Sequence, residues 1–354
     1  AHSNALGSTV GGTVINTAGA NSASLSFYGG ITLAEPLTFI GGSANGGCVN
    51  NNSGTNTLTG LITTTGGRFA AGGGTVLNIT GGMVAPTSPQ VVFNAAGTIN
   101  ITTTPLNFGT GIFWTDSGGL TVLGVASNTW GRLTLTGGTL RTDVANALPT
   151  NSTLQVGGVW YNPSCTLNLN GFNQTVGELS RAEPTPGTIA ITSAVPATLT
   201  VNQSTSTGYD GMFTGYVSLL KLGPGTLTIT NASTSTAGSF VVSNGTLVVG
   251  RDGTLGNSST NIVVGGTGTL TLQNSKTLAD AATLSIANGG TAKVSLASGV
   301  NESVRCLFFG DKQKRIGTYG ATGSGAGVID DEHFSGTGIL TVLRDKSGTL
   351  IKVR

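Results

Sequence analysis

The sequence predicts an all-β protein, specifically a parallel β-solenoid (β-helix) with rungs of about 20 residues. Three observations support this class. The 354 residues include 58 glycines, and one short glycine-led phrase recurs along the chain. Hydrophobic residues make up 38% of the chain and charged residues only 8%, whereas a disordered chain combines low hydrophobicity with high charge. Apolar and polar residues alternate within each phrase, which is typical of a half-buried strand.

The recurring phrase consists of glycine, then threonine or another small residue, then alternating apolar and polar residues. Its copies begin at Gly12, Gly74, Gly97, Gly119, Gly138, Gly187, Gly225, Gly245, Gly268 and Gly338. The starts at positions 74, 97, 119 and 138, and again at 225, 245 and 268, follow one another at a nearly constant interval. A regular period in this range is the sequence signature of a solenoid.

Each phrase is interpreted as one strand and the corner before it. In the copy at Gly225, Leu227 and Ile229 lie on one face of the strand and the threonines on the other. We expect the glycines to supply the positive φ angles of sharp corners, and Thr and Asn to form hydrogen-bonded ladders inside the solenoid. One phrase cannot bury its apolar face alone, so the copies must stack. A β-sandwich array is the alternative fold, but parallel stacking explains better why neighbouring copies look alike.

Charge is sparse and unevenly distributed. Residues 1–131 contain three charged side chains, whereas residues 302–354 contain 14. No basic stripe with interleaved aromatic residues occurs, so we expect no nucleic-acid partner. No run of about 18 apolar residues predicts a membrane-spanning helix, and no motif indicates a cofactor. Cys48, Cys165 and Cys306 lack metal or redox spacing; buried thiols are the favoured interpretation, and one disulfide with a spare thiol is the alternative.

The stretch from residue 219 to residue 250 carries the most specific pattern. It contains K-L-G-P-G-T-L-T-I, then T-A-G, then V-S-N-G-T-L-V-V. This order and spacing closely resemble the autotransporter-associated β-strand repeat, with weaker copies over residues 130–157 and 263–284. Residues 304–342, with G-T-Y-G and D-D-E-H-F-S-G-T-G, resemble the C-terminal module that follows such repeats in large secreted bacterial proteins. The resemblance implies export and a β-solenoid fold, and it implies no catalytic residues.

The predicted organisation is a body of β-solenoid repeats over residues 1–303 and a C-terminal β module over residues 304–354 that continues or caps the solenoid. Only residues 343–354 follow the last predicted strand, too few for the translocator barrel of an autotransporter. We therefore expect a passenger-like chain. The first residues, Ala1-His2-Ser3, fit a terminus left after signal-peptide removal, so we expect an extracellular or cell-surface location.

Two groups of side chains are candidate binding sites. Asp330, Asp331 and His333 supply ligand types for Ca²⁺ or a transition metal, but a charged turn is the favoured interpretation and no metal is expected. Trp160 and Tyr161 are candidates for stacking on a saccharide ring. Trp114 and Trp130 share this chemistry, and the alternative is that these aromatic residues fill corners of the solenoid.

The leading functional hypothesis is an exported structural protein that assembles head-to-tail into fibres. The chain's repeat-like ends offer uncapped strand edges. Val10 and Val14 would form one self-assembly edge, and Ile351 and Val353 the other. The expected partner is therefore the protein itself, as a homo-polymer. The alternative is an adhesin that binds a surface polysaccharide. A polysaccharide-degrading enzyme is third, because hydrolysis needs two facing carboxylates and Asp330-Asp331 is the only adjacent Asp pair.

Overall fold

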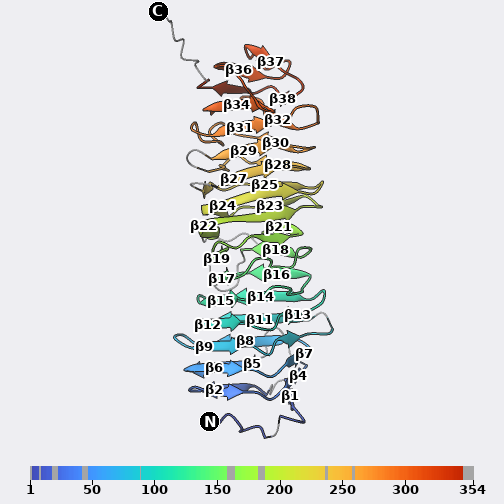
Figure 1. The fold of residues 1–354 in the computed structure, drawn as a ribbon, viewed down its shortest axis with the longest axis vertical. Helices are drawn as coiled ribbons and strands as arrows, with labels where there is room; N and C mark the ends of the chain where they lie inside the picture. Colours follow the sequence, from blue (N-terminus) through green and yellow to red (C-terminus); the bar gives the residue numbers. More distant parts are fainter. Residues whose placement is uncertain are drawn as a thin grey trace, which may run out of the picture. The chain divides into compact units, whose positions relative to one another are not determined.

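The structure, a computed structural model, describes residues 2–7, 9–17, 23–41, 47–87, 89–157, 164–181, 188–235, 238–256 and 260–345. Within these ranges the chain forms strands and turns and no helix. It divides into two compact units, Ala1–Asn202 and Gln203–Arg354. Figure 1 shows that the strands within each unit are stacked one above another.

Three parallel sheets make up the first unit. Sheet A contains, in order, β1 (Thr13–Asn16), β4 (Leu37–Ile40), β7 (Ile62–Thr64), β10 (Met83–Val84) and β13 (Leu106–Asn107). Sheet B contains β2 (Leu25–Tyr28), β5 (Gly47–Ser53), β8 (Gly67–Ala71), β11 (Gln90–Ala95), β14 (Ile112–Asp116), β16 (Arg132–Leu135), β18 (Thr153–Val156) and β21 (Glu178–Ser180). Sheet C contains β3 (Thr32–Leu33), β6 (Thr55–Leu58), β9 (Val76–Ile79), β12 (Thr98–Ile101), β15 (Leu120–Leu123), β17 (Gly138–Thr142), β19 (Cys165–Asn168) and β22 (Ile189–Asn202), and β20 (Gln174–Val176) also pairs with β22.

The second unit is organised in the same way. Sheet D contains β24 (Met212–Leu222), β27 (Ser239–Val242), β29 (Asn261–Val264), β31 (Thr283–Ile286), β34 (Cys306–Phe309) and β35 (Lys312–Gln313), and β26 (Thr234–Ser235) also pairs with β24. Sheet E contains β23 (Thr207–Tyr209), β25 (Thr226–Ile229), β28 (Thr246–Val249), β30 (Thr269–Leu272), β32 (Lys293–Leu296) and β38 (Phe334–Gly336). Sheet F contains β33 (Asn301–Val304), β39 (Ile339–Val342), β36 (Gly317–Gly320) and β37 (Val328–Ile329). The pairs β34–β35 and β36–β39 are antiparallel.

Successive rungs pair in register. In sheet C, Thr98 pairs with Leu120 and Leu120 with Thr139, so the second position of the phrase recurs at each of these rungs. In sheet E, Thr226 pairs with Thr246 and Thr246 with Thr269 in the same manner. Each phrase therefore lies directly beside its copy in the next rung. This confirms the predicted parallel β-solenoid, and the paired positions give the rung length of about 20 residues that the sequence period indicates.

The apolar positions of the phrases fill the interior. Leu227 and Ile229 are fully buried, whereas the threonines that alternate with them are half-buried. Phenylalanines from successive rungs meet edge to face, with ring centroids 6.1 Å apart for Phe69 and Phe93 and 5.0 Å apart for Phe93 and Phe113. Such aromatic contacts add to the stabilisation that burial alone provides.

Polar side chains connect the rungs in two ways. On the outer face of sheet C, Asn100 Nδ2 donates to Asn78 Oδ1 (2.9 Å) and Asn78 Nδ2 donates to Thr57 Oγ1 (3.2 Å). This ladder lies outside, whereas the sequence predicted such ladders inside the solenoid. Facing inward, buried side chains bond the backbone of the preceding rung. Asn56, for example, is fully buried and its Oδ1 accepts the Ile31 N–H at 2.7 Å. Such bonds satisfy backbone groups that strand pairing leaves unpaired.

The glycines of the phrase have two structural roles, of which the sequence predicts only one. Gly138 and Gly245 have the expected positive φ angles, +66° and +64°, but Gly97 and Gly119 do not have positive φ. A Cβ atom on Gly119 would lie 2.2 Å from the carbonyl oxygen of Gly97, and one on Gly97 would lie 2.3 Å from that of Gly72. The prediction that φ explains these glycines is therefore wrong at Gly97 and Gly119. Glycine is needed there because the backbone of the preceding rung occupies the place of a side chain.

The lysine of the K-x-G-x-G-T pattern closes a corner between two rungs. Lys221 is fully buried, and its Nζ donates to the carbonyl oxygens of Leu222 (2.9 Å), Gly223 (2.9 Å) and Asn244 (3.1 Å). Asn244 belongs to the next rung, so the ammonium group joins the two. Burial lowers the pKa of Lys221 to about 8.

The predicted boundary at residue 303 falls within the second unit. The boundary divides β33, which pairs in parallel with β39 of the predicted module, with Asn301 opposite Ile339. Main-chain hydrogen bonds thus join the two segments. Their division into separate domains stays a prediction.

Candidate functional site

The first strand of each sheet in the first unit pairs on one edge only within the part of the chain that the structure describes. β1, β2 and β3 begin sheets A, B and C, and pair with β4, β5 and β6. In sheet A, the N–H of Thr13 donates to Pro36 O and that of Thr17 to Ile40 O. Because backbone groups alternate in direction along a parallel strand, the N–H and C=O of Val14 point away from β4. Such an edge is a template for pairing with another chain.

Exposed apolar side chains gather on the rungs next to this edge. The large, exposed apolar residues described in the first unit are Val10 (94% exposed), Val14 (64%), Tyr28 (58%), Ile40 (46%), Leu61 (44%) and Val195 (51%). Five of these six precede residue 62. The structure therefore places both N-terminal residues of the predicted self-assembly edge, Val10 and Val14, in the open.

These first rungs expose no described Asp, Glu, Lys or Arg side chain. Residues 1–67 contain one such residue, Glu35. It is 4% exposed and accepts a hydrogen bond from Thr13 Oγ1, so its carboxyl group is buried. Proteins commonly protect a strand edge with lysine or with a covering element. No lysine or arginine precedes Arg68 in the sequence. The N-terminal segment covers part of the edge, because the outward N–H of Thr32 in β3 donates to Ser3 Oγ at 3.4 Å. The open part of the edge is therefore at Val14 of β1.

The opposite predicted edge cannot be placed, because Ile351 and Val353 lie outside the described residues. The described part of the second unit exposes Tyr216 (42%), Ile316 (61%), Val328 (43%), Ile329 (49%) and Leu343 (48%). Val328 and Ile329 form β37, which pairs only with β36 among the described strands. Sequence reasoning missed this second exposed edge, because β37 carries no copy of the phrase; its one signal was an apolar pair directly before an acidic turn.

The candidate metal ligands do not converge on one point. His333 Nδ1 lies 3.0 Å from Asp330 Oδ1, and His333 Nε2 lies 3.0 Å from Asn288 Oδ1. Both oxygens of Asp331 accept hydrogen bonds from Thr322, at 2.7 and 2.6 Å. Within the described ranges, no group of three or more His, Cys, Asp or Glu side chains is arranged to hold a metal ion. The three residues thus bond to protein groups in different directions.

Instead, the His333 ring packs on β34 within the predicted module. The His333 ring is nearly buried and stacks on Phe309, with centroids 3.8 Å apart and planes 5° apart, while Lys314 Nζ lies 4.2 Å from the Phe309 centroid on sheet D. Burial by itself would raise the pKa of Asp330, but the hydrogen bonds from His333 outweigh burial and hold that pKa below its usual value. This arrangement supports the interpretation of a charged structural turn.

The carboxylates of sheet B are too far apart for glycoside hydrolysis. Asp116 lies on the outer face, where it accepts from Asn94 Nδ2 (2.6 Å) and lies 3.4 Å from Arg68 Nη2; burial nevertheless raises the pKa of Asp116. Glu178 lies three strands away in the same sheet, a separation of roughly 20 Å from strand spacing and rise. Hydrolases hold their carboxyl groups about 5–9.5 Å apart. Asp116 and Glu178 therefore do not form such a pair.

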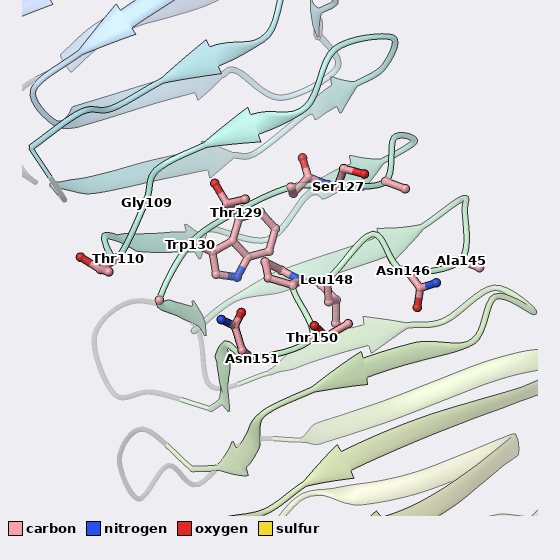
Figure 2. Close-up of a pocket in the computed structure, with 14 residues that line it drawn as sticks. Gly109, Thr110, Ser127, Thr129, Trp130, Ala145, Asn146, Leu148, Thr150 and Asn151 are labelled. Carbon is pink, nitrogen blue, oxygen red and sulfur yellow. The ribbon is translucent and has the colours of Figure 1, made fainter.

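A cleft of about 580 Å³ lies on the surface of the first unit (Figure 2). Trp160 and Tyr161, the predicted saccharide-stacking pair, lie outside the described residues. Trp130 lines the cleft and is 2% exposed, so its ring faces are not free to stack on a ligand. Trp114 is half-buried, and its Nε1 donates to Thr136 Oγ1 at 2.7 Å. The sequence named Trp130 as an aromatic candidate but gave no signal for the polar rim around it.

The three cysteines are free thiols. Cys48 and Cys165 are buried, and Cys306 is partly exposed. Burial raises the pKa of Cys48 and of Cys165 to about 11. Both thiols are therefore protonated at neutral pH, and they pack as small apolar side chains rather than acting as nucleophiles.

Comparisons with known proteins add no assignment: neither a protein-family model, nor a curated protein, nor a solved structure matches this chain. Among the described residues, no helix has the length and apolar character required to cross a membrane.

Proposed function

We propose that this chain is an exported structural protein of a cell surface or extracellular matrix, and that it self-associates through the edge formed by β1, β2 and β3. The observation that carries the proposal is the exposed, uncharged and apolar character of the first rungs. The partner is a second copy of the chain. No catalytic role is part of the proposal.

Burial of these side chains supplies a driving force of the required size. Fully burying a valine or similar side chain contributes about 1.5–3 kcal/mol, and Val10 and Val14 are 94% and 64% exposed. Association costs about 4–15 kcal/mol in lost freedom of motion, so one valine is insufficient. Tyr28 and Ile40, which are also exposed on these rungs, enlarge the apolar surface. Backbone hydrogen bonds to the open side of β1 would add to the free energy of association and fix the register of strand pairing.

The exposed β37 strand is the counterpart that head-to-tail assembly requires. A contact between two different surfaces of identical chains repeats, and it produces filaments when the rotation does not close. In this arrangement, the β1–β3 edge of one copy lies against β37 of the next. Export is supported by the resemblance to autotransporter-associated repeats and to the module of large secreted bacterial proteins. Labelling of intact cells with a membrane-impermeant reagent tests the location separately.

Sedimentation velocity over a range of concentrations tests the assembly. The parent chain should form species larger than a monomer, and Val14→Lys should remain monomeric, because it places a charge beside the open backbone edge. Val195→Lys is the matched control: Val195 is also exposed (51%) and lies in the first unit, but it belongs to β22 rather than to the first rungs. This control should associate like the parent.

A third variant, Val328→Lys, distinguishes the two possible geometries of association. Head-to-tail assembly predicts that Val328→Lys also prevents association, whereas contact between two β1–β3 edges predicts that Val328→Lys associates normally. If the parent remains monomeric at high concentration, or if Val14→Lys and Val195→Lys associate equally, the proposed function is wrong.

A further inference from the structure

The cleft of the first unit lies where sheet A ends. β13 is the last strand of that sheet, and one isolated bridge, between Asn107 and Thr129, continues it into the next rung. Sheets B and C carry on through further strands. Three successive turns, at residues 109–110, 126–131 and 145–151, border a hollow of about 580 Å³ at this point. Its volume lies within the range of small-molecule sites, about 300–1,000 Å³.

The lining of the cleft is neutral. Its polar side chains are hydroxyls and amides, those of Thr110, Ser127, Asn128, Thr129, Asn146, Thr150 and Asn151. Its apolar groups are led by Trp130, Leu148 and Pro149, and none of the described residues that line it is charged. Hydroxyls and amides both donate and accept hydrogen bonds. Such a lining suits a neutral ligand rich in hydroxyl groups and offers no counter-charge to an anion.

Trp130 carries an unsatisfied donor at this cleft. Its Nε1 is buried and has no hydrogen-bond partner among the described groups, although the indole N–H is a donor that proteins usually pair. The ring is fixed by Phe113, with centroids 4.9 Å apart. Figure 2 shows the indole among the lining residues, with its nitrogen in this view on the side of Asn151. A ligand hydroxyl that displaces the exposed Asn151 side chain would supply the missing acceptor.

The turns around the cleft are held in place before any ligand binds. Asn128 is buried, and its Oδ1 accepts the Leu106 N–H (2.8 Å), while its Nδ2 donates to Val125 O (2.7 Å) and Ala147 O (2.9 Å). One side chain thus joins three rungs behind the rim. A rim that is ordered in advance costs less conformational entropy on binding.

We propose that this cleft binds a neutral saccharide, with a sugar hydroxyl accepting the Trp130 Nε1–H and the threonine and asparagine side chains of the rim bonding other hydroxyls. The site is independent of self-association, because its lining lies in rungs beyond those of the β1–β3 edge. It gives a structural protein of this kind a means of holding neutral polysaccharide.

Isothermal titration of the monomeric Val14→Lys variant with neutral gluco-, galacto-, manno- and xylo-oligosaccharides tests the inference without interference from assembly. If Val14→Lys does not fold, the parent chain replaces it. We expect one neutral series to bind with a Kd below about 1 mM, a weak but specific affinity, and uronate oligosaccharides of equal length to bind more weakly. Trp130→Phe keeps the ring and removes the N–H, and it should raise Kd about tenfold.

Trp114→Phe is the matched control, since it removes an indole N–H from the same unit outside the cleft; it should leave Kd unchanged. If Trp130→Phe does not fold, Asn151→Asp replaces it, because a negative charge at the rim should change the affinity by at least threefold. The inference is overturned if no neutral series binds at 10 mM saccharide. It is also overturned if the cleft variant, Trp130→Phe or Asn151→Asp, binds with the same Kd as Trp114→Phe and the parent.

Discussion

Replacing Gly119 by alanine should destabilise the first unit by about 2–6 kcal/mol, the sum of one overpacking cost and two weakened hydrogen bonds. The added Cβ would lie 2.2 Å from Gly97 O and 2.5 Å from Ala95 O, both backbone atoms of the preceding rung. Ordinary contact begins near 3.4 Å, so the two rungs must separate by about 1 Å. That movement stretches the bonds from Gly119 N to Ala95 O (2.6 Å) and from Leu120 N to Gly97 O (2.9 Å). Overpacking costs about 1–3 kcal/mol and each weakened hydrogen bond about 0.5–1.5 kcal/mol.

Urea unfolding followed by tryptophan fluorescence measures this effect in the correct unit. All three tryptophans precede residue 203 and therefore report on the first unit. Gly73→Ala is the matched control, because a Cβ there meets nothing within 4 Å and the φ angle is not positive. It should be neutral or stabilising by about 0.4–1 kcal/mol. If Gly119→Ala proves as stable as Gly73→Ala, close backbone contact is not the reason for this glycine.

Two further predictions concern the interior. Phe93→Ala should cost the first unit about 3–5 kcal/mol, because Phe93 is fully buried between Phe69 and Phe113; fluorescence-detected urea unfolding checks it, and a loss below about 1 kcal/mol would contradict the interior packing. Because burial lowers the pKa of Lys221 to about 8 from 10.5, the folded state loses this proton as pH rises past 8 while the unfolded state keeps it. The stability of the second unit should therefore rise by up to about 1.4 kcal/mol per pH unit between pH 8 and 10.5 through this group. Titration of the Lys221 ¹³Cε signal checks the pKa directly, and a value near 10.5 would mean that the three carbonyl groups fully offset the loss of hydration.

The repeat in the sequence was sufficient to predict the solenoid, because alternation and period are local properties. Leu227 and Ile229 face the core as their positions predict. Contacts between rungs were harder to predict from the sequence, because they depend on which atoms the stacking of rungs brings together. The close approach of backbone at Gly119, the bond from Lys221 to Asn244 and the bonds from Asn128 to three rungs all depend on neighbours that are distant in the sequence.

The candidate sites were predictable to different degrees for the same reason. The exposure of Val14 follows from the alternation along β1, in which Thr13 and Ile15 are half-buried and Val14 is exposed. The separate bonding of Asp330, Asp331 and His333 could not be deduced from their adjacency, because their partners Thr322 and Asn288 lie elsewhere in the chain. The cleft at Trp130 arises from the end of sheet A, and no local pattern marks the rung at which a sheet stops.

Cryo-electron microscopy of the protein at a concentration where it associates tests the proposed function most directly. The account predicts particles in which β1, β2 and β3 of each internal copy lie against a neighbouring copy, with Val14 buried at the junction and strand spacing of about 4.8 Å continuing across it. Single unassociated particles at every concentration would contradict it. So would assemblies in which the first rungs remain exposed to solvent.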